Sequence, residues 1–212
     1  MARLAQIGVI FVVVTLMLSG LGDAEIDPET AVGVWLLDEG RGNMVNDSSD
    51  NGNDGRFMGA PKWVDGVFGK ALRFDGRDDM VPVGQNKILR VEVGTMMNWI
   101  NIATTDDSGL SSMTIPYDDG GAWDAPWRSL GLGTYQGQLR YWIAVNDENG
   151  EMQPVDIEKG RWYHQAITFD GRSRRAYLDG ELKAELEGRG KITYGRPTPT
   201  AVIGSASIEV QR

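Results

Sequence analysis

Carboxylates and aromatic side chains gather in one stretch of the chain, residues Pro116 to Trp127 (PYDDGGAWDAPW). An aromatic ring can stack on the apolar face of a sugar, and carboxylates accept hydrogen bonds from its hydroxyl groups. Long irregular loops in compact domains often carry function. The alternative is a loop whose tryptophans pack back onto the fold. We predict a saccharide site made by Tyr117, Asp118, Asp119, Trp123, Asp124 and Trp127, with Trp142 as a further candidate.

A second stretch, Asn46 to Gly55 (NDSSDNGNDG), is rich in side-chain oxygens. Ca²⁺ takes carboxylate, amide and backbone oxygens as ligands, although the spacing here is not that of an EF-hand. Asp and Asn also favour turns for conformational reasons alone, which is the alternative reading of the stretch. The predicted cofactor is therefore calcium, with candidate ligands Asp47, Asp50, Asn51, Asn53 and Asp54.

Three carboxylates near the N-terminus, Glu25, Asp27 and Glu29, stand at alternate positions. On a strand they would share one face, and retaining glycoside hydrolysis uses two carboxyls about 5–5.5 Å apart. The run resembles the E-x-D-x-E strand of laminarinase-type glycosidases. However, Pro28 is disfavoured in a central strand, so we expect a polar leader without catalytic residues. A second alternating pair, Asp156 and Glu158, adjoins a predicted loop.

The rest of the composition excludes several kinds of chemistry. The chain has no cysteine, which rules out disulfides, thiolate zinc sites and cysteine nucleophiles. It has a single histidine, His164, and no G-x-S-x-G motif, so we expect His164 to be structural. The net charge is −9 and no run of Lys and Arg occurs, so nucleic acid is not an expected partner.

The elements that must position these residues are predicted to be strands. Short apolar runs alternate with Asn-Gly and Asp-Gly pairs, which favour tight turns between antiparallel strands. Residues Leu139 to Val145 show the clearest strand pattern, because apolar residues occupy every second position. We also expect a first strand over Ala31 to Leu37 and a strand within Leu89 to Ile102 whose Trp99 lies in the core.

Several motifs resemble one family of secreted domains. They are W-x-x-DEG-x-G from Trp35, DSS-x-NGNDG from Asp47, FGKAL-x-FDG from Phe68, and a later block running from Gly160 to Gly180. Together they are similar to laminin-G-like, concanavalin-A-like jelly-roll domains. The resemblance implies an all-β fold, a two-sheet antiparallel β-sandwich of jelly-roll topology. That fold hosts lectins, glycosidases, adhesion modules and spacers, and many of its members bind calcium near a rim.

The N-terminus predicts export. One positive charge is followed by the apolar run Leu4 to Leu18 and then by small residues, the pattern of a signal peptide ending at Ala24. The run is shorter than the roughly 20 residues of a spanning helix, so cleavage is favoured over a retained membrane anchor. We therefore expect a signal peptide over residues 1–24 and one jelly-roll domain over residues 25–212, secreted, periplasmic or on the cell surface, with no membrane contact after cleavage.

The C-terminus departs from the resembled family. Its final strand is expected to follow Gly204, but Ser207 to Arg212 match that pattern poorly, so this segment is either a degenerate remnant or the start of a truncated strand. From all these features we predict an exported, non-catalytic module that binds carbohydrate or an extracellular protein, assisted by calcium. The alternatives are a glycoside hydrolase of the same fold and a purely structural domain of a larger surface protein.

Overall fold

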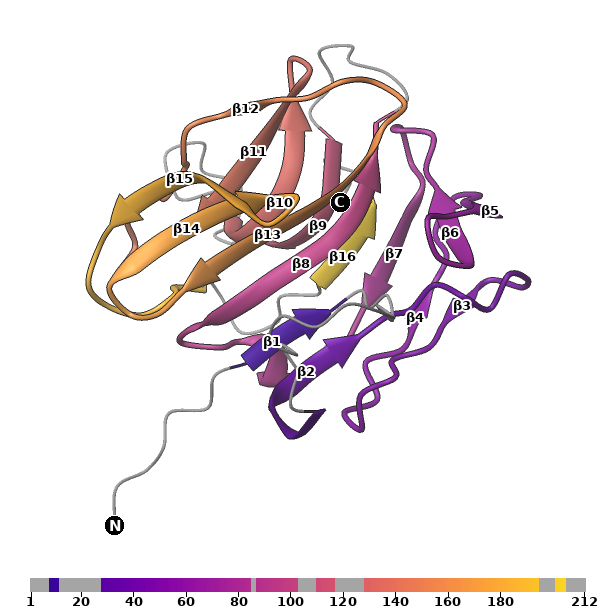
Figure 1. The fold of residues 1–212 in the computed structure, drawn as a ribbon. Helices are drawn as coiled ribbons and strands as arrows, with labels where there is room; N and C mark the ends of the chain where they lie inside the picture. Colours follow the sequence, from indigo (N-terminus) through magenta and orange to yellow (C-terminus); the bar gives the residue numbers. More distant parts are fainter. Residues whose placement is uncertain are drawn as a thin grey trace, which may run out of the picture.

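The strands form two facing β-sheets and one small hairpin (Figure 1). The computed structural model describes residues 8–11, 28–84, 87–102, 110–116, 128–194 and 201–204. Within these ranges the helical elements are two short 3-10 turns, Pro28–Thr30 and Lys87–Leu89. No helix in the described ranges is long and apolar enough to cross a membrane. The predicted all-β, two-sheet antiparallel sandwich is therefore confirmed.

The first sheet has six strands. In spatial order they are β15 (Glu181–Glu187), β14 (Ser173–Leu178), β13 (Trp162–Phe169), β8 (Gly94–Asn101), β1 (Gly8–Phe11) and β2 (Ala31–Val34). β15, β14, β13 and β8 pair antiparallel, whereas β1 pairs parallel with both of its neighbours. The register places His164 of β13 opposite Trp99 of β8.

The second sheet has eight strands. Their order is β12 (Val155–Asp156), β11 (Gln138–Ile143), β10 (Arg128–Tyr135), β9 (Leu110–Pro116), β16 (Ala201–Gly204), β7 (Met80–Val83), β4 (Gly55–Arg56) and β3 (Met44–Val45). A separate hairpin pairs β5 (Lys62–Asp65) with β6 (Lys70–Arg73). Because β12 and β15 are edge strands of different sheets, the space between them lies at one side of the sandwich (Figure 1).

The core lies between the sheets and follows the alternation of the strands. In β11, Leu139, Tyr141 and Ile143 are fully buried while Arg140 and Trp142 alternate with them on the outer face. This is the pattern predicted for Leu139 to Val145, and its inward residues join a single apolar cluster.

Two strand predictions need correction. The first strand ends at Val34 rather than Leu37, because Leu37 takes a left-handed conformation with φ 56°. Trp99 does not lie in the core: Met96 and Ile100 of β8 are buried, and Trp99 alternates with them on the outer face. A strand carries every second residue on the same face, so the inward positions of Met96 and Ile100 put Trp99 outside.

Candidate binding pocket at the edge of the sandwich

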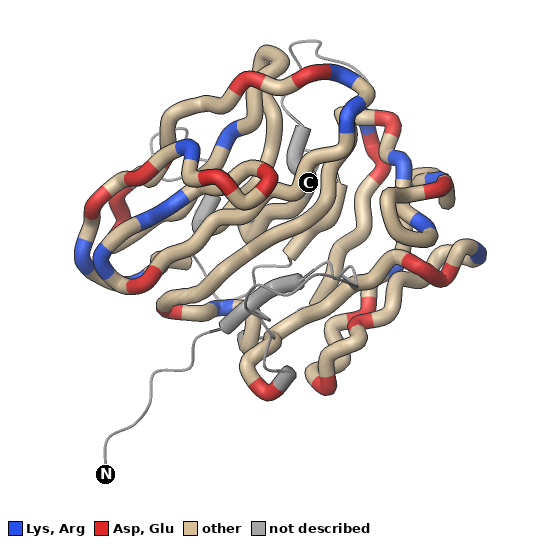
Figure 2. The backbone as a smooth tube through the Cα atoms, in the orientation of Figure 1, with Lys and Arg blue, Asp and Glu red and all other residues tan. Residues whose placement is uncertain are grey.

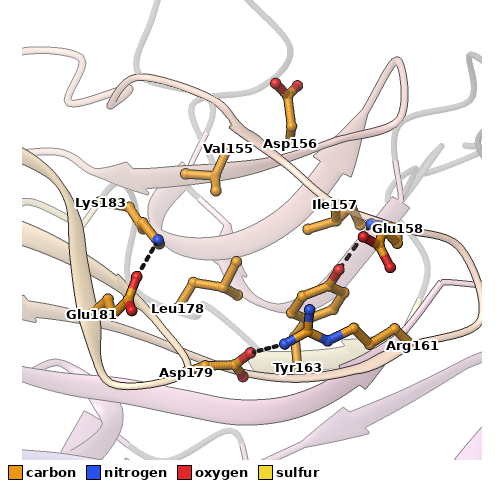
Figure 3. A pocket seen from close by; sticks show the side chains of 10 residues that line it. All are labelled: Val155, Asp156, Ile157, Glu158, Arg161, Tyr163, Leu178, Asp179, Glu181 and Lys183. Carbon is orange, nitrogen blue, oxygen red and sulfur yellow. Dashed lines mark hydrogen bonds and ion pairs between the residues drawn. The ribbon is translucent and has the colours of Figure 1, made fainter.

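A pocket of about 470 Å³ opens where β12 faces β13, β14 and β15 (Figure 3). The residues around it come from both sheets and from the segment between β12 and β13. They are Val155, Asp156, Ile157, Glu158, Arg161, Tyr163, Leu178, Asp179, Glu181 and Lys183. Both acidic and basic residues lie along this side of the molecule (Figure 2).

The base of the pocket is apolar. Tyr163 of β13 and Leu178 of β14 face inward and are 4% and 6% exposed. The Tyr163 hydroxyl accepts a hydrogen bond from the backbone N–H of Glu158 at 2.9 Å, which ties the segment after β12 to β13. The Arg161 guanidinium lies over the Tyr163 ring, 4.6 Å from its centre, so a cation covers part of the aromatic face.

The rim carries two ion pairs. Arg161 Nη2 donates to Asp179 Oδ2 at 2.9 Å, and Lys183 Nζ donates to Glu181 Oε2 at 2.6 Å. The hydrogen bond from Lys183 lowers the pKa of the Glu181 carboxyl. All four side chains are about one-third or more exposed, and exposed ion pairs contribute little to stability because water screens them. They can therefore exchange a partner for a bound ligand at little cost.

Asp179 has a fixed position because of the turn it begins. Asp179 and Gly180 both have positive φ, at 51° and 83°, the combination required by a two-residue turn that matches the twist of a hairpin. Asp179 Oδ1 accepts the backbone N–H of His164 at 2.9 Å, and Asp179 N–H donates to the His164 carbonyl at 2.8 Å. One carboxylate thus binds β13 through one oxygen and Arg161 through the other.

An aromatic trio, Phe68, Trp99 and His164, lies on the outer face of the six-stranded sheet. The Phe68 and Trp99 ring centres are 5.5 Å apart in an edge arrangement, and the Trp99 and His164 rings are 5.4 Å apart. Phe68 is 41% exposed. Burial lowers the pKa of His164, and the Asp179 carboxylate offsets part of that effect, so the imidazole is neutral at neutral pH. Asp179 therefore adjoins both the trio and the pocket.

The predicted saccharide residues are not those that line this pocket. Tyr117, Asp118, Asp119, Trp123, Asp124 and Trp127 lie outside the described residues. Trp142 is described, on the outer face of the eight-stranded sheet opposite Gly131 of β10, and it does not line the pocket. Sequence reasoning missed Arg161, Tyr163 and Asp179, although the alternating pair Asp156 and Glu158 was a signal for this region.

The predicted calcium loop, Asn46 to Gly55, is held by its own hydrogen bonds. Asp47 Oδ1 accepts the backbone N–H groups of Val34 and Ser49, and its Oδ2 accepts that of Asn53, all within 2.9 Å. Asn53 is 1% exposed and donates to the Val32 carbonyl. Asn51 donates to the Ala31 carbonyl, Asp54 Oδ1 accepts the N–H of Asp47, and Asp50 is exposed. These hydrogen bonds hold the loop against β2.

The turn before β7 brings three carboxylates together. Ligand atoms of Asp75, Asp78 and Asp79 lie within 4.8 Å of one another, close enough for one metal ion. Asp79 is 5% exposed, and its oxygens accept the backbone N–H groups of Ala60 and Asp75. The N–H of Arg77 lowers the pKa of Asp75. These carboxylates have the oxygen chemistry that Ca²⁺ prefers.

Of the three N-terminal carboxylates, the structure describes Glu29, and Glu29 does not lie in a strand. Glu29 lies in the 3-10 turn Pro28–Thr30, which precedes β2, while Glu25 and Asp27 lie outside the described residues. A 3-10 turn does not place alternate residues on one face. The described part of this run therefore agrees with the leader expected from Pro28.

Comparison with known proteins agrees with this architecture. The family model described as "Concanavalin A-like lectin/glucanases superfamily", a laminin-G family, matches residues 75–211. No curated protein matches the chain at a significant level. The resemblance noted in the sequence is thereby confirmed.

Three solved structures illustrate the shared fold. A Trypanosoma rangeli sialidase mutant with trans-sialidase activity has a TM-score of 0.59 at 17% identity, over 84% of this chain and 28% of that one. The receptor-binding domain of botulinum neurotoxin D has a TM-score of 0.55 at 13% sequence identity, over 79% of this chain and 45% of that one. Domain 4 of the extracellular arabinanase AbnA from Geobacillus stearothermophilus was solved with arabinotriose. It has a TM-score of 0.53 at 14% sequence identity, over 75% of this chain and 84% of that one. This chain thus spans less than half the length of the sialidase chain and of the toxin chain.

Proposed function

Since this chain belongs to the concanavalin A-like lectin/glucanases superfamily, we propose that it is an exported, non-catalytic module that binds carbohydrate through the pocket between β12 and β15. The pocket itself is the observation that carries the proposal. It combines an apolar base at Tyr163 and Leu178 with hydrogen-bonding groups of both kinds on its rim. Sugars present C–H faces and hydroxyl groups that both donate and accept, so they match such a lining.

Each charged group on the rim can form a hydrogen bond with a sugar hydroxyl group. Arg161 and Lys183 are donors, whereas Asp179, Glu181 and Glu158 are acceptors. Because the hydroxyl groups of one sugar can bridge a donor and an acceptor, a bound sugar can take the place of the two rim ion pairs and leave each charged group hydrogen-bonded. The arabinanase domain, which has the same fold, was solved with arabinotriose and is consistent with such a role.

The state of three carboxyls in the pocket favours binding over hydrolysis. A glycosidase needs one carboxyl with a raised pKa as its general acid. In the pocket, Asp179 is paired with Arg161, and the hydrogen bond from Lys183 lowers the pKa of Glu181. Asp156 accepts a hydrogen bond from Gln138 and points away from Leu178 (Figure 3). The hydrolase alternative is supported by the fold, which the T. rangeli sialidase shares.

We also propose that calcium assists the module, but at a different site from the loop predicted from the sequence. The turn of Asp75, Asp78 and Asp79 suits a cation better than the Asn46 to Gly55 loop, because it brings ligand atoms of three carboxylates within 4.8 Å of one another, whereas both oxygens of Asp47 in the loop accept backbone N–H groups. The turn directly precedes β7. A Ca²⁺ ion there would stabilise the fold without being part of the sugar pocket.

A glycan array tests the proposed function. The exported protein should bind a defined set of glycans, and Arg161→Ala should lose that set. Arg175→Ala is the matched control, because Arg175, like Arg161, forms an ion pair with an Asp but lies outside the pocket. Binding to a protein in place of any glycan would favour a role like that of the toxin's receptor-binding domain. Release of a sugar product from a bound glycan would favour the hydrolase alternative.

A further inference from the structure

The charges around the pocket are not balanced. Its lining includes four carboxylates and two cations, so the pocket has an excess of two negative charges. The carboxylates are Asp156, Glu158, Asp179 and Glu181, and the cations are Arg161 and Lys183. Lys159, which follows Glu158 in the sequence, does not line the pocket. Because of this excess, the lining interacts differently with glycans of different charge.

Both cations of the pocket are already paired with a carboxylate. Arg161 pairs with Asp179 at 2.9 Å, and Lys183 pairs with Glu181 at 2.6 Å. A carboxylate or sulfate group on a ligand would have to compete with Asp179 or Glu181 for its cation. The displaced carboxylate would then face a second anion, and like charges placed side by side oppose binding. An anionic glycan is therefore a poor match for this lining.

The two remaining carboxylates, Asp156 and Glu158, supply the excess charge. Asp156 accepts a hydrogen bond from the neutral amide of Gln138 at 2.8 Å. Among the described residues, neither Asp156 nor Glu158 forms an ion pair, and both are exposed. The backbone of Glu158 is fixed beside the base of the pocket, because its N–H donates to the Tyr163 hydroxyl (Figure 3). A ligand cation can therefore pair with these two groups without breaking an ion pair inside the protein.

We propose that the pocket selects glycans that carry a protonated amino group and discriminates against glycans that carry carboxylate or sulfate groups. The inference rests on the proposed function, because it concerns the ligand of the same pocket. An amino sugar keeps the C–H face and the remaining hydroxyl groups that match the apolar base and the rim. Its ammonium group adds a positive charge and three hydrogen-bond donors beside Asp156 and Glu158.

An array of matched sugar sets tests the selectivity. Each set presents one sugar backbone in four forms, with a hydroxyl, an amino, an acetamido or a carboxylate group, as in oligomers of glucose, glucosamine, N-acetylglucosamine and glucuronic acid. Binding is measured at about pH 6, where an amine is protonated. The amino form should bind at least about threefold more tightly than the two neutral forms, and the carboxylate form should bind most weakly, because each exposed carboxylate contributes a modest attraction. The preference should shrink in about 1 M salt, where the Debye length is about 3 Å.

Variants that remove one charge each locate the effect in the pocket. Asp156→Asn and Glu158→Gln preserve the size of the side chains, and the double variant should lose the preference for the amino form. Glu187→Gln is the matched control, because it removes an exposed carboxylate from β15 that does not line the pocket. It should keep the wild-type preference, which separates attraction by the pocket from attraction by the whole chain with its net charge of −9. A full preference retained in the double variant would overturn the inference.

The outcomes separate a failure of this inference from a failure of the proposed function. If the neutral or carboxylate forms bind as tightly as the amino form, and Arg161→Ala still loses binding, the charge selectivity is wrong and the carbohydrate site stands. If no form of any sugar binds, both proposals fail. Binding to a lysine-rich peptide and to no glycan would also overturn both, because the excess charge would then serve a basic protein partner.

Discussion

Arg161 and Asp179 form an ion pair of 2.9 Å across the mouth of the pocket, with Arg161 also lying over the Tyr163 ring. The two residues come from different parts of the chain, one just before β13 and one in the turn between β14 and β15. The second oxygen of Asp179 accepts the N–H of His164, so the pair is anchored to the middle of the sheet. Its geometry is therefore set by the fold before a ligand arrives.

The two roles of Asp179 can be separated by substitution. Asp179→Asn keeps a side-chain oxygen for the His164 N–H and tolerates positive φ, so its stability should be close to that of the wild type. Asp179→Ala loses the hydrogen bond and strains the backbone, and it should cost about 1–3 kcal/mol. Urea unfolding measures both variants. Equal stability of Asp179→Ala and the wild type would contradict the anchoring role.

His164 should make stability depend on pH in a narrow window. Burial lowers its pKa in the folded protein below the ordinary value of 6.5, so the unfolded chain binds the proton more tightly. Its contribution is therefore complete above about pH 6.5 and is lost as the pH falls below it. Unfolding free energies between about pH 5 and about pH 7.5 should fall less in His164→Gln than in the wild type. Identical pH profiles would contradict the shift, since this is the only histidine in the chain.

Asp47 should be structural rather than a metal ligand. It accepts three backbone N–H groups, those of Val34, Ser49 and Asn53, so Asp47→Ala leaves three donors without their partner. We expect a loss of about 2–4 kcal/mol, the same in EDTA and in excess Ca²⁺. Chemical unfolding in both buffers measures it. A loss seen only with Ca²⁺ present would instead identify Asp47 as a calcium ligand.

Calcium binding at the Asp75, Asp78 and Asp79 turn has its own test. A ligand that binds only the folded state raises Tm, so Ca²⁺ should raise the Tm of the wild type relative to EDTA. Asp78→Asn should remove that increase, because Asp78 is an exposed member of the cluster. Asp50→Asn, an exposed residue of the other loop, is the control. The calcium proposal fails if the wild type has the same Tm in both buffers.

The sequence predicted the scaffold well for local reasons. The alternation of Leu139 to Val145 and the Asp179-Gly180 turn are determined by neighbouring residues, and both appear as expected. Trp99 was misplaced because a large aromatic residue usually serves burial, whereas the register of β8 points it outward. The oxygen-rich loop at Asn46 was ambiguous because the same residue types suit metal binding and turns.

The pocket could not be predicted from sequence because topology, not spacing, assembles it. Val155 belongs to the eight-stranded sheet and Leu178 to the six-stranded one, and no local pattern shows that they meet. Arg161 reads as an ordinary polar residue beside a strand until its contacts with Tyr163 and Asp179 are known. The fold was therefore accessible from periodicity and turns, while the candidate site required the arrangement of two edge strands.

Isothermal titration of the protein with a glycan selected on the array tests the central claim most directly. The account predicts that Arg161→Ala weakens binding at least about tenfold, corresponding to about 1.4 kcal/mol, while Arg175→Ala binds like the wild type. Matched unfolding curves confirm that both variants are folded. Equal affinities of Arg161→Ala and the wild type would contradict the assignment of carbohydrate binding to this pocket.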